Sequence, residues 1–458
     1  MSRLALLVAA AFFMEYLDGS IIATALPKMA LSLGGTPVEL HIGISAYLLA
    51  VAVFILPGGW ASERFGARRV FTSAIAIFTL GSVLCGVAQS VNGFVAARVL
   101  QGIGGAMMVP VGRLVVLRTT EKQDLMRAVA LLTWPALSAP LLGPPLGGFI
   151  SENFSWRWNF FINLPLGLIG VALALWLVPR MVASSRQPFD LKGFVLGTCF
   201  LLCGTAALDL LGDSNVPWRE LGGLSTVAVV SCVLFVRHIH RCPHPMVNPA
   251  TFGIVTFRAV MVGGTVMRTL ISTMPFLLPL LFQLGFGLDP FHAGLLVLAL
   301  FAGNITIKPL TSSILHRWGF RSVLIGNGLL QAATMLACAF LSPATPVVVI
   351  AALLVLSGAS RSLQFTAFST LAFADVPQPS MPSANTLFSV AFQLAMGLGV
   401  AFGAVTLQGM SQVFGVTGTP TLQVFHATFA ITALLMAISA LDGFRLAHDA
   451  GAVVARRT

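Results

Sequence analysis

Fourteen apolar stretches, each long enough to cross a lipid bilayer, run through this chain of 458 residues. A helix needs roughly 20 apolar residues to span the hydrocarbon core, and only helices or closed barrels satisfy the backbone there. The stretches lack a period-two alternation of apolar and polar residues, so we expect helices. They cover residues 4–26, 41–60, 70–89, 93–117, 128–150, 159–178, 193–211, 221–237, 259–283, 291–311, 322–341, 346–369, 383–408 and 425–444.

Composition supports an all-α polytopic membrane protein with no sizeable domain outside the bilayer. Hydrophobic residues make up 57% of the chain and charged residues 9%, whereas soluble domains carry about 25% charged residues. The net charge of +11 is spread over the loops in ones to threes, so we expect the lipid bilayer and not nucleic acid as a partner.

The basic residues also predict the orientation of the chain. Of the 26 Lys and Arg residues, 18 fall in one set of alternate loops and tails, three in the other set and five inside apolar stretches. This bias predicts cytoplasmic termini and an even number of helices. Glu15 and Asp18 interrupt the first stretch, so we expect a retained helix and not a signal peptide.

An internal repeat indicates a duplicated architecture. The segment 63–68 (Glu-Arg-Phe-Gly-Ala-Arg) is echoed by 316–321 (His-Arg-Trp-Gly-Phe-Arg). Parallel repeats of this kind build transporters from two similar halves with the binding site between them, near the midplane. We therefore predict a six-helix half over residues 1–178, two extra helices with cytoplasmic linkers over 179–258, and a second six-helix half over 259–458.

Ordered motifs carry a resemblance to a known family. Residues 59–68 resemble its motif A, 98–102 its motif B, and 141–148 its antiporter motif C. Residues 17–27 and 156–167 resemble two runs of the fourteen-helix drug:proton antiporter branch (EmrB/QacA-like proteins) of the major facilitator superfamily. The resemblance implies the superfamily fold and a monomeric, proton-coupled antiporter that exports small organic compounds or drugs by alternating access.

Motif A has a physical rationale in a protein whose halves must rock against each other. A carboxylate at Glu63 beside Arg64 and Arg68 can latch the halves on one side, and Gly66 permits a tight turn. Gly59 opens the motif. The alternative is that these arginines only fix the topology.

Motif C supplies Gly143, Pro144, Gly147 and Gly148 within one predicted helix. Glycines let helices approach closely, and prolines bend a helix. The motif predicts either a hinge that biases the direction of exchange or simple helix packing.

Ionisable residues inside a membrane are costly and are functional by default. Glu15 and Asp18 lie three residues apart, on one face of a helix. A desolvated carboxylate takes up a proton more readily than one in water, as proton coupling requires. We expect Asp18 to couple protons, Glu15 to assist and Arg98 of motif B to relay them. The alternatives are an ion pair of Asp18 with Arg98 or Arg113, and a structural role for Arg98.

The embedded cations exceed the embedded anions. Arg113, Arg268, Lys308 and Arg361 are not required by the motifs, and a buried guanidinium needs a partner. An anionic ligand would supply one, because the guanidinium fork suits carboxylates and phosphates. The alternative for some of them is snorkelling to the interface. The full set of predicted substrate-binding residues is Arg113, Arg268, Lys308, Trp134, Asn304 and Arg361.

Two cargo classes therefore stay open: drug-like compounds, or an organic anion such as citrate or a metal-citrate chelate.

No P-loop sequence is present, so we expect the proton motive force and no ATP or other cofactor. No catalytic motif is present and the six cysteines lack metal-type spacing, so we expect neither an enzyme nor a metal site. A channel or membrane sensor is the rival from another class, and the repeated motif A argues against it.

Overall fold

The computed structural model describes residues 3–22, 25–34, 37–121, 124–180, 188–211, 216–416, 418–447, 450–451 and 454. Within these ranges the chain forms helices joined by short turns, and no β-strand occurs. The predicted all-α class is confirmed.

The N-terminal part of the chain contains nine helices, some of them short. They are α1 (Arg3–Ile21), α2 (Leu26–Leu33), α3 (Pro37–Phe54), α4 (Gly58–Phe65), α5 (Ala67–Val87), α6 (Val91–Thr119), α7 (Leu125–Asn153), α8 (Trp158–Phe161) and α9 (Asn163–Leu177). Two long helices follow, α10 (Leu191–Leu211) and α11 (Trp218–Arg241).

The remaining helices form the C-terminal part. They are α12 (Val255–Ser272), α13 (Met274–Leu280), α14 (Pro290–Thr306), α15 (Lys308–Cys338), α16 (Val347–Ala374), α17 (Met381–Val413) and α18 (Leu422–Leu441). Short 3-10 turns lie at Pro249–Gly253, Gln378–Ser380 and Asp442–Arg445, and a π-helical turn at Leu281–Gly285.

Each of the fourteen predicted apolar ranges coincides, to within a few residues, with one helix or with consecutive helices. Ten helices of the described chain are long and apolar enough to cross a membrane, and twelve if two bent pairs each count as one span. The bent pairs join α3 to α4 at 56° and α14 to α15 at 54°. Further along, α15 breaks again at Gly319. The architecture is therefore that of a polytopic membrane protein with twelve to fourteen helices.

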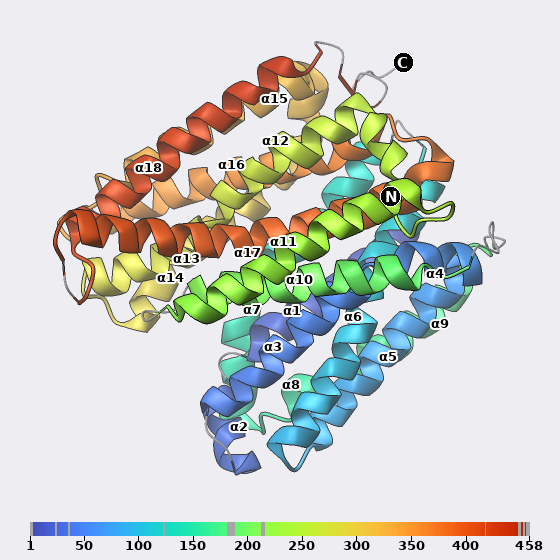
Figure 1. The fold of residues 1–458 in the computed structure, drawn as a ribbon. Coiled ribbons are helices and arrows are strands. Elements are labelled where there is room, and N and C mark those ends of the chain that lie inside the picture. The colour runs from blue at the N-terminus through green and yellow to red at the C-terminus, as the bar shows by residue number, and fades with distance from the viewer. Residues whose placement is uncertain are drawn as a thin grey trace.

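The helices gather in two bundles. In Figure 1, the blue bundle of α1 to α9 and the yellow-to-red bundle of α12 to α18 meet near α4 and diverge toward the end that carries α2 and α8. Within the first bundle α5 packs on α6 and α1 on α7, and within the second α14 packs on α16 and α12 on α17. The bundles touch where α17 meets α4 and α6, and where α7 meets α14 and α16.

The two extra helices lie on the outside. Only 22% of the spanning window of α10 and 17% of that of α11 is buried, against 67% for α1. The two helices pack on each other, and α10 also contacts α3 of the first bundle and α17 of the second (Figure 1). The domain boundaries at residues 178 and 258 stay predictions.

The internal repeat is visible in backbone geometry. Gly66 has φ 84° and separates α4 from α5, and Gly319 has φ 72° inside α15, 253 residues later. Only glycine adopts such left-handed backbone angles readily. Two residues beyond each glycine an arginine donates to a backbone carbonyl near the end of its own bundle, in the last turn of α9 and in the 3-10 turn that follows α18. Arg68 Nη2 donates to the Leu175 carbonyl, and Arg321 Nη2 donates to the Phe444 carbonyl over 3.2 Å. Cations at helix C-termini also complement the helix dipole.

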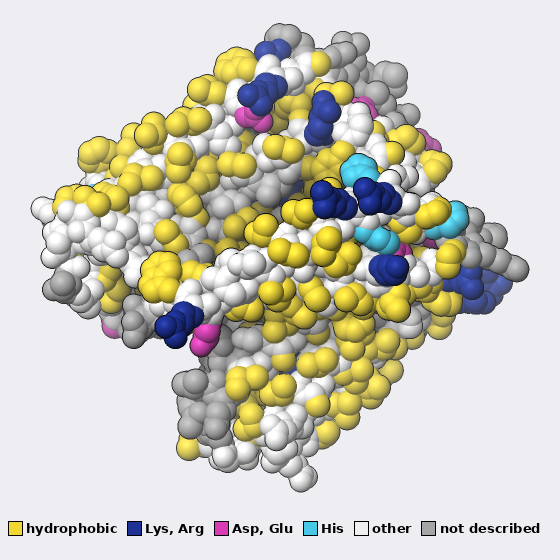
Figure 2. Space-filling view, in the orientation of Figure 1, with side chains coloured by type: hydrophobic (Ala, Val, Ile, Leu, Met, Phe, Trp, Pro, Cys, Tyr) yellow, Lys and Arg dark blue, Asp and Glu magenta, His cyan; other side chains and the backbone are white. Residues whose placement is uncertain are grey.

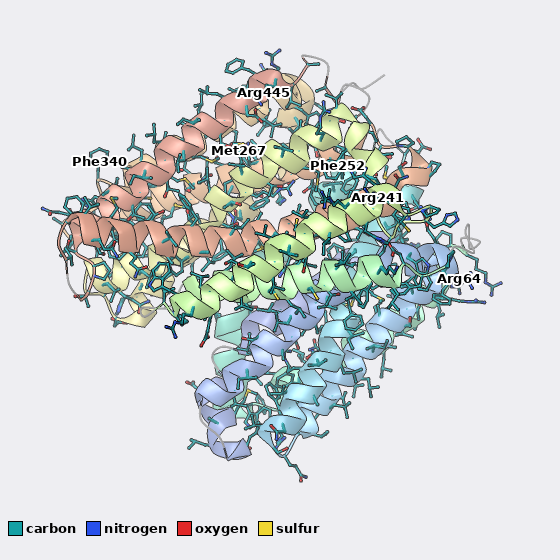
Figure 3. The ribbon with its side chains drawn as sticks, viewed as in Figure 1. Arg64, Arg241, Phe252, Met267, Phe340 and Arg445 are labelled. Atoms are coloured by element: carbon teal, nitrogen blue, oxygen red, sulfur yellow. The ribbon has the colours of Figure 1, made fainter. Side chains whose placement is uncertain are left out.

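The surface and the bundle ends agree with a membrane location. Apolar side chains cover much of the face over α10 and α11 (Figure 2). Arg64, Arg241 and Arg445 all lie at one end of the bundles, whereas Phe340 lies at the opposite end (Figure 3). These three arginines, which the charge pattern assigns to one side, therefore share one end. The assignment of this end to the cytoplasm stays a prediction.

Close glycine packing holds the second bundle together. A Cβ atom at Gly303 would collide with the carbonyl oxygen of Val355, and one at Gly358 with the carbonyl oxygen of Leu300. The helices α14 and α16 therefore approach each other as closely as their backbones allow, in the manner of small-residue crossings in membranes.

We predict that Gly303→Ala lowers the thermal unfolding temperature of the purified protein, because overpacking costs about 1–3 kcal/mol. Gly294→Ala is the matched control on the same helix, since a Cβ there meets nothing within 4 Å. The control should be neutral or slightly stabilising because alanine favours helix over glycine by about 1 kcal/mol. Equal unfolding temperatures for the two variants would contradict this account of the α14–α16 crossing.

Candidate functional site

A fully buried polar network joins three helices of the first bundle. Asp18 Oδ2 on α1 accepts a hydrogen bond from Arg98 Nη1 on α6 over 2.7 Å. Asp18 Oδ1 accepts from Gln101 Nε2 over 2.9 Å and from Asn163 Nδ2 on α9 over 2.8 Å. The Arg98 guanidinium also lies 4.2 Å from the centre of the Tyr47 ring on α3. Both oxygens of Asp18 are therefore satisfied by hydrogen-bond donors.

Arg98 and Asp18 are 0% and 1% exposed, so the pair has no contact with bulk water. This is the ion pair that the sequence left open as the alternative to a coupling role for Asp18. Breaking such a buried pair by removing one charge is strongly destabilising, because the other charge stays buried. Nη2 and Nε of Arg98 lack a hydrogen-bond partner in the described part of the chain, and the Tyr47 ring is the group that faces the guanidinium.

Glu15 differs from Asp18 although it lies one turn away on α1. The side chain is buried, and its Oε2 has no hydrogen-bond partner among the described residues. A Cβ at Gly105 would lie 3.4 Å from Glu15 Oε1 and 3.1 Å from the Tyr47 hydroxyl. The missing side chain at Gly105 therefore leaves room for both groups beside α6.

Two arginines from different bundles share one aromatic ring. Arg113 on α6 lies 5.2 Å from the centre of the Phe388 ring on α17, and its Nη1 donates to Ser389 Oγ over 3.3 Å. Arg268 on α12 lies 4.5 Å from the Phe388 ring and 5.6 Å from the Phe368 ring. Arg268 is 1% exposed, and none of its three guanidinium nitrogens has a hydrogen-bond partner in the described ranges. Cation–π contacts offset only part of such a desolvation cost.

Aromatic rings continue from this pair toward Arg361. The Arg361 guanidinium on α16 lies 5.5 Å from the Phe365 ring. The rings of Phe365 and Phe392 are 5.8 Å apart, and those of Phe392 and Phe388 are 6.5 Å apart and stacked at 24°. Three of the predicted substrate-binding arginines are therefore linked by phenylalanine rings of α16 and α17.

The other predicted substrate-binding residues lie nearby in the second bundle or are not described. Lys308 Nζ donates to Thr366 Oγ1 over 2.9 Å. Asn304 is fully buried, and neither atom of its amide has a hydrogen-bond partner within the described part of the chain. The side chain of Trp134 lies outside the described residues.

The motif A residues lie where the bundles meet, but the geometry differs from the expected latch. Glu63 Oε1 lies 3.9 Å from Arg118 Nη2 on α6 of the same bundle, whereas Arg64 is exposed (Figure 3). Successive helical residues point about 100° apart, so Glu63 and Arg64 face different surroundings. Gly59 lies at the contact between the bundles. Its backbone is so close to α17 that a Cβ atom added there would lie 2.8 Å from Thr386 Oγ1.

A second contact between the bundles lies close by. Asn385 Nδ2 on α17 donates to the backbone carbonyl of Pro110 over 2.7 Å. This hydrogen bond engages the backbone of α6 from the other bundle. Contacts of α4 and α6 with the start of α17 therefore hold the two bundles together at the end where they meet, which we call the closed end.

Motif C packs α7 against α1. A Cβ at Gly143 would collide with the Ser20 side chain, whose hydroxyl donates to the Ala139 carbonyl over 3.1 Å. A Cβ at Gly148 meets nothing within 4 Å, and Gly147 is buried. The side chain of Pro144 lies outside the described residues. The helix α7 nevertheless continues across the whole motif.

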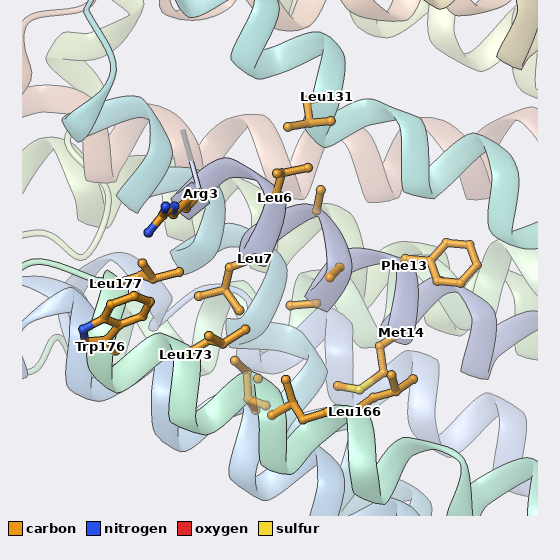
Figure 4. Close-up of a pocket in the computed structure, with 16 residues that line it drawn as sticks. Arg3, Leu6, Leu7, Phe13, Met14, Leu131, Leu166, Leu173, Trp176 and Leu177 are labelled. Carbon is orange, nitrogen blue, oxygen red and sulfur yellow. The ribbon is translucent and has the colours of Figure 1, made fainter. Parts of the chain in front are cut away.

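A separate apolar groove of about 780 Å³ lies between α1 and α9 (Figure 4). Arg3, Trp176 and Leu177 gather at one end, and leucines such as Leu6 and Leu166 line the rest. The groove contains none of the buried charged residues of the network, and several of its lining side chains, such as Leu6, Leu166 and Trp176, are exposed. We therefore place the candidate site in the interior and not in this groove.

Comparison with known proteins agrees with this architecture. The sequence model described as the Major Facilitator Superfamily matches residues 8–400. The chain belongs to the major facilitator superfamily. It is 37% identical over 455 residues to a protein of Cronobacter sakazakii and 38% identical over 448 residues to one of Pectobacterium carotovorum, covering 98% and 97% of this chain and 96% and 95% of theirs. Both are provisionally named multidrug resistance protein MdtD.

Solved superfamily structures share the fold. The human organic anion transporter MFSD10 superposes with a TM-score of 0.69 over 96% of this chain and 99% of that one. The proton:xylose symporter XylE superposes with a TM-score of 0.63 over 95% and 94%. Each is 15% identical, so these likenesses concern the fold alone. The chain is thus a multi-pass membrane transporter of this superfamily and not an enzyme.

Sequence reasoning missed several residues that build the site. Gln101 lies within the motif B segment and Asn163 within the run 156–167. Their position in these motifs was therefore a sequence indication that they belong to the site. Tyr47 and Phe388 have no motif around them. Their positions opposite Arg98 and Arg268 follow from helix packing.

We predict that Asp18→Asn and Glu15→Gln differ sharply in stability. Asp18→Asn leaves the Arg98 charge uncompensated, a loss on the order of 3–5 kcal/mol, whereas Glu15→Gln removes a carboxylate with one unbonded oxygen. Thermal unfolding of the two purified variants in the same detergent measures the contrast. A larger loss for Glu15→Gln than for Asp18→Asn would refute the assignment of Asp18 as the structural anion.

Proposed function

We propose that this protein is a monomeric, proton-coupled antiporter that exports small organic compounds across the bacterial inner membrane by alternating access. Superfamily membership and the multidrug resistance names of its relatives support export of drug-like cargo. We expect the proton motive force to drive it, without ATP or another cofactor. The observation that carries the proton coupling is the contrast between Glu15 and Asp18.

Glu15 suits a proton carrier better than Asp18 does. Both oxygens of Asp18 already accept hydrogen bonds, so this residue orients Arg98 and α1. Glu15 is buried and has an unbonded oxygen, so a proton can bind there without breaking a hydrogen bond. Protonation of Glu15 would remove a buried charge, and release of the proton would restore it. Asp18 and Arg98 then act as positioning residues for the carrier.

The arrangement of the bundles supports alternating access. The bundles meet at the end that carries α4 and diverge toward the other end (Figure 1). The contacts of Gly59 with Thr386 and of Asn385 with Pro110 must break when the closed end opens. The bundles would then rock around the interior site, as transporters with repeated halves do.

We predict that Glu15→Gln abolishes proton flux evoked by a lipophilic cation in proteoliposomes that contain a pH-sensitive dye. Glutamine has the same shape but cannot carry the proton. The variant should still bind cargo, which equilibrium binding to the detergent-solubilised protein checks. The matched control is Glu220→Gln, which alters an exposed carboxylate at the start of α11. Normal flux in Glu15→Gln would rule out this residue as the carrier.

An organic anion is a second candidate cargo, and one observation favours it. Arg268 presents three buried guanidinium nitrogens that no described group satisfies, and Arg113 from the other bundle lies against the same Phe388 ring. A carboxylate between the arginines would satisfy both, with the bidentate geometry that guanidinium groups favour. Closure of the bundles around such a cargo would then depend on its charge.

We predict that citrate-evoked flux, if citrate is cargo, falls at least about tenfold in Arg268→Met, because a charged hydrogen bond is worth about 1.5–3 kcal/mol. Methionine is apolar and similar in length, so the variant should fold. Arg219→Met is the control, since Arg219 is exposed. Citrate-evoked flux that persists in Arg268→Met, or no citrate-evoked flux in the unaltered protein, would eliminate this candidate and leave cationic or neutral compounds.

A further inference from the structure

Three side chains with metal-binding donors converge outside the transport site, where α10 begins and α11 ends. Asp190 immediately precedes α10, His238 lies in the last turn of α11, and Cys242 caps the C-terminal end of α11. One ligand atom from each residue lies within 4.8 Å of the others. His238 and Cys242 are four residues apart, so they share one face of the last helical turn.

The three donors have the chemistry of a site for a borderline transition metal. Thiolate, imidazole and carboxylate are the ligands that Zn²⁺ takes in proteins, at about 2.0–2.3 Å. Donors around a tetrahedral ion of that size lie about 3.3–3.6 Å apart. The Asp190 Oδ1 to His238 Nε2 distance is 2.7 Å, so an ion that replaces the shared proton needs them to separate by less than about 1 Å.

The surroundings position Asp190 and leave Cys242 accessible. Gly193 N donates to Asp190 Oδ1 over 2.8 Å, and Met246 N donates to Asp190 Oδ2 over 3.2 Å. Such second contacts fix the orientation of a ligating carboxylate. Cys242 lines a polar cavity of about 420 Å³, which gives an ion a route from solvent and room for a water ligand.

The cluster is connected to the closed end of the bundles. The cavity beside Cys242 is also lined by Glu63 of α4 and Ser383 of α17, and Asn248 N of the linker donates to Ser383 Oγ over 2.5 Å. The Phe189 ring, next to Asp190, lies 4.8 Å from the Trp60 ring of α4.

We propose that Asp190, His238 and Cys242 bind one divalent transition-metal ion of the Zn²⁺ class, with water completing the coordination. Binding deprotonates the Cys242 thiol and uses neutral His238, and the released proton passes to solvent. The ion joins α10 to α11 and fixes the linker against α4 and α17. The sequence does not reveal this site, because Asp190 lies 48 residues before His238.

Cobalt(II) titration of the reduced, full-length protein tests the proposal, because Co²⁺ occupies Zn²⁺ sites and shows a thiolate charge-transfer band. We expect one equivalent of Co²⁺ with this band, displaced by Zn²⁺, and a higher thermal unfolding temperature with Zn²⁺. Cys242→Ser should remove the band, and His238→Ala and Asp190→Asn should weaken binding at least about tenfold.

Two control variants separate the site from adventitious binding. Cys203→Ser alters another half-buried cysteine, on α10. His292→Ala alters a second His–Asp pair, with Asp289, which is not part of a metal-type cluster among the described residues. Both should bind Co²⁺ normally. A missing thiolate band in the unaltered protein, or a band that survives Cys242→Ser, would show that the cluster is only a structural hydrogen-bonded contact between α10 and α11.

Discussion

A charged pair without access to water, Asp18 and Arg98, constrains the first bundle more than any other contact. Its cost in a low-dielectric interior is recovered only when further donors complete the geometry, and Gln101 and Asn163 supply them. Three helices, α1, α6 and α9, are consequently fixed around one carboxylate, and α3 joins them through the Tyr47 ring that faces Arg98. The neighbouring Glu15 can be left with an unbonded oxygen because this pair already holds α1 in place.

The second bundle has no comparable buried anion among its described residues. Arg268 and Arg361 face phenylalanine rings, and several of their nitrogens have no hydrogen-bond partner in the described part of the chain. The two bundles are therefore alike in backbone but unequal in electrostatics. The first bundle carries a compensated pair and a buried carboxylate with an unbonded oxygen, and the second contributes buried cations that lack an anionic partner among the described residues. In the transport cycle proposed above, this asymmetry would assign the proton to the first bundle and the cargo to the arginines that meet at Phe388.

Much of the fold could be predicted from the sequence because each helix must be apolar over its own length to cross a bilayer. The repeat of Gly66 at Gly319 was equally readable, since a left-handed turn leaves glycine as the residue that fits. The candidate site was only partly predictable. Motifs marked Asp18 and Arg98, but the partner of Glu63 proved to be Arg118, because the direction of a side chain on a short helix depends on what packs beside it.

Sequence by itself determined the helical, membrane-spanning class, the duplicated plan and the presence of costly charges inside the apolar stretches, since all three are local properties of composition and spacing. Tertiary structure alone decided which charges are paired. It brought Arg113 and Arg268 to one ring of Phe388, Asn385 to the Pro110 carbonyl, and Asp190 to His238 and Cys242. Each of these contacts joins residues of different helices, so it depends on the packing of the helices, which the pattern along any one helix does not contain.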